Sequence, residues 1–143
     1  MADAAVRSFI NAVHAQSRAA MIPAISAAAI KAMIAECYAP GATFIRPSGN
    51  PMSMIDYESM MTSGMVTMTE SELVSIDNVN VFAGGKSAWV VTKEHQSFTY
   101  TPQGGEPIPN NDLATISYIL ENNDGTAWKI VGGHRGTGQP FEG

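Results

Sequence analysis

The sequence is poor in cysteine and in charged residues. Its lone cysteine, Cys37, cannot form an intramolecular disulfide, and it falls on the apolar face of an expected helix, so we expect it in the core. Only 15% of the residues are charged, the formal net charge is −5, and no run of basic residues could neutralise phosphates. Nucleic acid is therefore not an expected partner.

Long apolar runs and metal or cofactor motifs are also missing. The longest apolar run, residues 19–30, contains Pro23 and is too short to span a bilayer, so no contact with a membrane is expected. Asp3 precedes Arg7 without a basic segment leading into an apolar one, which argues against a secretory signal and favours the cytoplasm, although the compartment stays open. The three histidines are far apart and no HxH, HExxH, CxxC or GxSxG spacing occurs, so neither a metal nor a cofactor is expected.

What the chain does contain is enough apolar sequence for one core. Hydrophobic residues make up 45% of the 143 residues, which fits a single domain over residues 1–143. The low charge leaves apolar surface that a second copy could cover, so a homodimer is expected.

Helical spacing dominates the first part of the chain. It predicts one helix from Asp3 to about Gln16 and a second through the alanine-rich run 24–35, with Pro23 in its first turn. Ser53 is expected to cap a third helix, because its side-chain oxygen can accept from free backbone N–H groups.

Strand signals follow those of the helices. Pro40 and Gly41 end the second helix and predict a chain reversal before a short strand at residues 43–45. From Ser71 onward the apolar period is two, with a change of phase near Asp77 that predicts a bulge. Further strands are expected at residues 73–82, 88–100, 113–120 and 127–131, with a mobile connection at 101–111 and a hairpin turn at 122–125. Helices first and an antiparallel sheet afterwards predict an α+β fold.

Residues 38–49, YAPGATFIRPSG, precede the third expected helix. This segment resembles the nuclear transport factor 2-like (NTF2-like) superfamily, which includes SnoaL-like polyketide cyclases and ketosteroid isomerases. The resemblance implies a cone-shaped fold in which N-terminal helices pack on a strongly curved antiparallel sheet around a cavity. It names no substrate, since one fold hosts unrelated activities.

Residues 128–140, WKIVGGHRGTGQP, form a second region of resemblance. They are similar to the last strand of calcium/calmodulin-dependent kinase association domains and of iota-class carbonic anhydrases. This chain departs from the anhydrases, because Gly132 and Gly133 precede a single histidine where those enzymes carry consecutive histidines.

Arg46 is the first candidate site residue. In the ketosteroid isomerases the catalytic aspartate stands at the position of Arg46, and an arginine, which stays protonated, cannot be that base. Steroid-type isomerisation is therefore not expected. The resemblance instead directs Arg46 towards the cavity, where its guanidinium would match a carboxylate or phosphate.

His134 is the candidate catalytic residue. Counted in steps of two along the last strand, Ile130, Gly132 and His134 share one face, so His134 is expected to exchange a proton in the cavity. In contrast, an exposed position is expected for His14. It is also favoured for the pair Glu94 and His95, with entry of one of the two into the cavity as the alternative.

The remaining candidates are expected to bind a ligand. Besides Arg46, they are Tyr57, Tyr118, Thr115 and Met61. Six of the nine methionines fall between residues 52 and 68, and filling of the core is favoured over the lining of a pocket.

Three functions remain open. The first is a pocket for an anionic or carbonyl-bearing small molecule. The second is a metal-free lyase, hydratase or isomerase, resembling a carbonic anhydrase or a polyketide cyclase, with His134 for proton transfer and Arg46 at an oxyanion. The third is an association module in which the sheet forms a homodimer.

Overall fold

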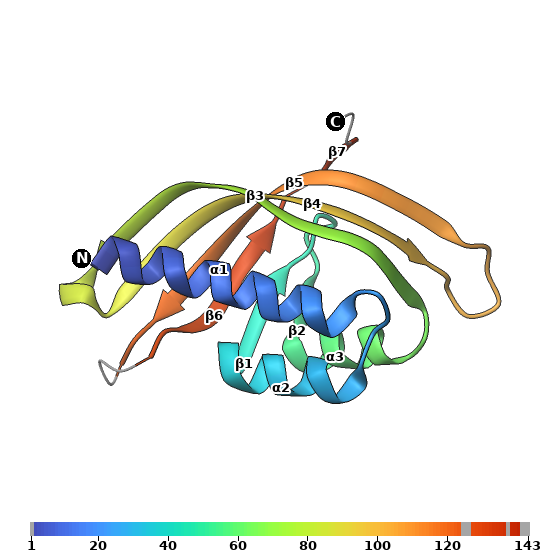
Figure 1. Ribbon diagram of the computed structural model, residues 1–143, viewed down its shortest axis with the longest axis horizontal. Helices are drawn as coiled ribbons and strands as arrows, with labels where there is room; N and C mark the ends of the chain where they lie inside the picture. The colour runs from blue at the N-terminus through green and yellow to red at the C-terminus, as the bar shows by residue number, and fades with distance from the viewer. Residues whose placement is uncertain (1, 124–126, 137, 141–143) are drawn as a thin grey trace.

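The computed structural model describes residues 2–123, 127–136 and 138–140 (Figure 1). Three α-helices and a short 3-10 helix accompany the strands of one sheet, so the α+β class is confirmed. The elements are α1 (Ala2–Met21), α2 (Ala27–Cys37), β1 (Tyr38–Ile45), β2 (Pro51–Ser53), α3 (Met54–Thr62), β3 (Val66–Phe82), η1 (Ala83–Gly85), β4 (Ser87–Tyr100), β5 (Ile108–Glu121), β6 (Lys129–Arg135) and β7 (Gln139–Pro140).

The sheet has the strand order β2-β1-β6-β5-β4-β3, with β7 paired to β5. Neighbours are antiparallel except β1 and β6, which run parallel. The sheet bows over α1, as Figure 1 shows, but it is not strongly curled, and the expectation of a strongly curved sheet was wrong in degree. The bend is spread along the long strands β3 to β5 instead of closing the sheet around the helices.

The helices differ from the prediction mainly at their ends. α1 continues to Met21 and so extends beyond Gln16. Pro23 lies in the connection before α2, and Ser26 caps that helix by accepting from the backbone N–H of Ala29 at 3.2 Å.

The cap of α3 is confirmed. The Ser53 hydroxyl oxygen accepts from the backbone N–H of Asp56 at 3.1 Å, as the capping pattern predicts.

The predicted chain reversal at Pro40 and Gly41 was wrong. β1 begins at Tyr38, directly after α2, and both residues lie inside it. They occupy an irregularity between Tyr38 and Thr43, where the register with β6 shifts and Gly41 has a φ of 80°. Proline and glycine interrupt the strand pairing here without turning the chain back.

The long strands match the period-two pattern and extend beyond it. β3 begins at Val66, earlier than expected, and its register with β4 shifts between Ile76 and Asn78, which confirms the predicted bulge. β5 begins at Ile108, so the connection that was expected to reach residue 111 spans only 101–107. Residues 124–126 of the expected hairpin turn lie outside the described residues.

The core lies between α1, α2 and the concave face of the sheet. Val6, Ile10 and Val13 of α1 are buried, as their helical spacing predicts. Cys37 is buried at the end of α2, as expected. No helix within the described ranges is long and apolar enough to cross a membrane.

Candidate functional site

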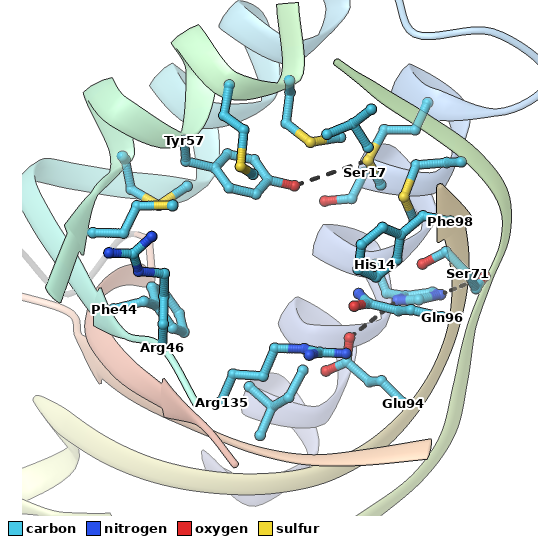
Figure 2. Close-up of a pocket in the computed structure, with 18 of the residues that line it drawn as sticks. His14, Ser17, Phe44, Arg46, Tyr57, Ser71, Glu94, Gln96, Phe98 and Arg135 are labelled. Atoms are coloured by element: carbon cyan, nitrogen blue, oxygen red, sulfur yellow. Dashed lines mark hydrogen bonds and ion pairs between the residues drawn. The ribbon is translucent and has the colours of Figure 1, made fainter. Parts of the chain in front are cut away.

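A cavity of about 500 Å³ opens between the helices and the concave face of the sheet (Figure 2). Side chains from α1, α3 and strands β1 to β6 line it, so it depends on the whole fold. Its volume falls within the range of about 300–1,000 Å³ that small-molecule sites occupy.

The cavity brings together four of the six predicted site residues. They are Arg46, Tyr57, Met61 and Tyr118. Arg46 is exposed at the end of β1, and its Nε donates to the backbone carbonyl of Asn50 at 3.4 Å.

Thr115 and His134 do not line the cavity. On β5 the side chains alternate, so that Ile116 and Tyr118 face the cavity while Thr115 is exposed. His134 is likewise exposed. The expectation that His134 exchanges a proton in the cavity therefore finds no support in its position.

A bulge in β6 explains the misplacement of His134. Ile119 pairs with Gly132 and Leu120 pairs with Ile130, which leaves Val131 as one extra residue in β6. The extra residue reverses the direction of every later side chain. Ile130 is therefore buried in the core while His134 points outward.

The same reversal turns Arg135 into the cavity, opposite Ile116 on β5. In Figure 2 its side chain reaches towards Glu94 and His14. The Nε and Nη2 atoms of Arg135 are buried, and within the described part of the chain they have no hydrogen-bond partner. These two N–H groups point the same way on a guanidinium and form the planar fork that matches a carboxylate. Sequence reasoning missed this residue.

Glu94 forms a buried polar cluster near Arg135. Its side chain is 5% exposed, and its Oε2 accepts from the hydroxyls of Tyr118 at 2.6 Å and Thr92 at 2.7 Å. Oε1 lies 3.8 Å from Nδ1 of His14, whose Nε2 is 3.1 Å from the Ser71 carbonyl oxygen. The expected exposure of Glu94 and His14 was therefore wrong.

Interactions within the cluster shift the pKa values of its members. Burial by itself raises the pKa of Glu94, but His14, Tyr118 and Thr92 lower it more, so that it lies below the ordinary value of 4.5. Burial likewise lowers the pKa of His14, but the attraction of Glu94 brings it above 6.5. Burial also raises the pKa of Tyr118 well above 10.0, so its hydroxyl keeps the proton that it donates. The pair His14 and Glu94 can hold and exchange a proton inside the cavity.

The ion pair predicts a pH-dependent effect of replacing His14 with glutamine. Because the pKa of His14 is raised on folding, its contribution to stability is complete below the unfolded pKa and is lost as the pH rises through the folded pKa. Urea unfolding should show the largest gap between wild type and His14→Gln near pH 6, and a smaller gap at pH 9. His134→Gln, an exposed control, should show no such trend. A gap for His14→Gln that is equal at both pH values would contradict the ion pair.

Thioethers form the other side of the cavity. Six methionines line it, namely Met21, Met52, Met54, Met60, Met61 and Met68. The Tyr57 hydroxyl among them donates to the sulfur of Met21 at 3.8 Å, and burial raises the pKa of Tyr57 to about 12. Methionines that the sequence favoured as core filling thus form an adaptable apolar wall.

The opposite face of the sheet carries apolar residues as well. Trp89 on β4 pairs with Ile119 on β5, and both are exposed. The homodimer through the sheet stays a prediction.

Within the described residues no three histidine, cysteine or acidic side chains gather into a possible metal site.

Solved structures that share this architecture include several NTF2-like proteins. An NTF2-like protein of unknown function from Prochlorococcus is 28% identical, with a TM-score of 0.65 over 81% of this chain and 85% of the other. One of unknown function in nutrient uptake from Rhodospirillum rubrum is 20% identical, with a TM-score of 0.68 over 90% and 97%. The association domain of C. elegans CaMKII is 16% identical, with a TM-score of 0.52 over 92% and 89%.

These likenesses establish the NTF2-like superfamily that the segment 38–49 suggested. The chain belongs to the DUF3804 family of proteins of unknown function, whose model matches residues 13–141. No protein with a curated description matches the sequence.

Proposed function

We propose that this protein binds a small organic anion in its cavity and that Arg135 is the anchor. The single observation behind the proposal is the half-buried guanidinium of Arg135, whose buried Nε and Nη2 have no partner among the described residues. An unpaired buried donor costs free energy, and a buried charge costs more, so such a group favours a ligand that pairs with it.

The charge of the cavity supports the proposal. Among the described residues, the lining contains the cations Arg46 and Arg135 and one carboxylate, that of Glu94, and the pKa of the lining residue His14 is raised. The lining is therefore positive although the whole chain carries a formal charge of −5. Such a local field attracts anions into the cavity.

Arg46 has a secondary part in this proposal. Its exposed guanidinium near the cavity would attract an entering anion, and solvent screening keeps its contribution small. Enzymatic proton transfer stays a prediction from the resemblance, with the buried pair of His14 and Glu94 better placed for it than His134.

A panel of small organic acids and their neutral amides tests the proposal. Acids that bind should raise the unfolding temperature of the wild type by several degrees at concentrations well above Kd, and the matching amides should not. The variant Arg135→Met should lose this response, because charge-assisted hydrogen bonds of about 1.5–3 kcal/mol disappear. Lys86→Met removes the same charge from an exposed position outside the cavity and should keep the response. A panel in which no acid stabilises the wild type more than Arg135→Met would refute the anion site.

A further inference from the structure

The lining of the cavity is divided into a polar and an apolar side. Arg135, Glu94, His14 and Gln96 lie together in Figure 2, and the sulfur atoms line the wall that runs from Arg46 past Tyr57 to Phe98. A ligand that fills the cavity therefore meets charge at one end and thioether and aromatic surface at the other. This arrangement fits a molecule that is itself divided in the same way.

The polar end suits a group with a single negative charge. Arg135 is the buried cation there, and one guanidinium fork matches the two oxygens of one carboxylate. Glu94, whose pKa is lowered, is ionised at neutral pH and repels a dianion such as a phosphate monoester. Arg46 offers little compensation because it is exposed and donates to the carbonyl of Asn50.

The apolar side suits an uncharged body. Unbranched, polarizable methionine side chains adapt to alkyl chains and rings of different shapes. A second negative charge placed against this wall would lose its water, and the nearby Arg46 (Figure 2) is exposed, screened by solvent and already donates to the Asn50 carbonyl.

We infer that the ligand is an amphiphilic monocarboxylate, with its carboxylate on Arg135 and an alkyl or cyclic apolar body against the methionines. This inference rests on the proposed anion site and adds the chemical class of the ligand. Because the Nε and Nη2 donors are shielded from solvent in the ligand-free structure, the inference requires the Arg135 side chain to change its rotamer when the carboxylate binds.

Titration calorimetry of the full chain with four probes at neutral pH tests the inference. The probes are decanoate, acetate, the ten-carbon dicarboxylate sebacate and the neutral decanamide. Each buried methylene strengthens binding about fourfold, so decanoate should bind at least about 100-fold more tightly than acetate. Sebacate and decanamide should each bind at least about tenfold more weakly than decanoate, because one adds an unpaired charge and the other lacks the carboxylate.

Three variants separate the contributions of the two ends of the ligand. Arg135→Met should weaken the binding of decanoate at least about tenfold, and it should leave the binding of decanamide unchanged or make it stronger. Met60→Gln should weaken the binding of decanoate several-fold, because Met60 lines the cavity and would contact the apolar body of the ligand. It should leave the binding of acetate, which lacks such a body, unchanged. Met65→Gln is its control, since Met65 is also half-buried but lies outside the lining.

The outcomes distinguish the inference from the proposed function. If acetate, sebacate or decanamide binds as tightly as decanoate, the inference of an amphiphilic monocarboxylate ligand is wrong. If short polar acids bind in an Arg135-dependent way and decanoate does not, the anion site stands and this inference falls. If no acid depends on Arg135, both fall.

Discussion

Replacing Gly133 with alanine should lower the free energy of unfolding by about 3 kcal/mol, the upper part of the range for overpacked sites. A Cβ at this position would lie 2.2 Å from the backbone carbonyl oxygen of Ser117 and 2.6 Å from the Phe44 ring. Neither neighbour can yield cheaply. The oxygen belongs to the adjacent strand β5, and the Phe44 ring packs edge to face against Tyr118 with centroids 5.7 Å apart.

A neighbouring glycine provides the control for this measurement. A Cβ at Gly136 would lie 3.3 Å from the Thr115 carbonyl oxygen, so a shift of a few tenths of an ångström is enough. Urea unfolding should therefore place Gly136→Ala within about 1 kcal/mol of wild type. Equal stability of Gly133→Ala and Gly136→Ala would show that the sheet does not pack as described at β6. The test also reports on the site, because Phe44 and Tyr118 both line the cavity.

Replacing Arg135 with methionine should raise the stability of the ligand-free protein while it removes anion binding. The buried Nε and Nη2 atoms have no partner among the described residues, and unsatisfied buried donors cost about 1–3 kcal/mol. Methionine has a similar length, suits a wall that already contains thioethers, and carries no charge. We expect a gain of about 1–3 kcal/mol in the free energy of unfolding, measured in ligand-free protein with urea.

Opposite signs for stability and binding are what separate a binding residue from a structural one. A functional site stores unfavourable interactions that a ligand relieves, and its removal stabilises the fold. Lys86→Met, which deletes the same charge from an exposed position, should stay within about 0.5 kcal/mol of wild type. A loss of stability in Arg135→Met would mean that the guanidinium supports the fold, and it would weaken the proposed anion site.

Local signals in the sequence predicted the structure correctly where the chemistry or polarity of a side chain indicates its local environment. Ser53 carries the oxygen that caps α3, and the phase change near Asp77 is visible because apolar side chains stand on both sides of it. The segment 38–49 also indicated the superfamily correctly. These features depend on neighbours only a few residues apart.

The bulge at Val131 left no such trace. The two residues that follow it, Gly132 and Gly133, have no side chains whose polarity could reveal a change of phase. Counting in steps of two therefore assigned His134 to the same face as Ile130, and Arg135 was overlooked.

The burial of Glu94 was missed for a different reason. Its neighbours on the inner face of β4 include Thr92 and Gln96, so this stretch of strand lacks an apolar side by which to recognise the interior. The polar residues are buried there because they hydrogen-bond to one another. Tyr118 donates to Glu94 from the adjacent strand β5, and Thr92 donates to it from the same strand.

The sequence by itself determined the presence of three helices, though not their ends, the period of the strands and the superfamily. It also named Arg46, Tyr57, Met61 and Tyr118, which line the cavity. Only the tertiary structure decided that Arg135 and Glu94 face that cavity and that His134 does not. The physical reason is that one extra residue in β6 moves the side chains that follow it to the opposite face of the sheet. Only the pairing of β6 with β5 locates that residue. The result places Arg135 in the cavity and His134 outside it.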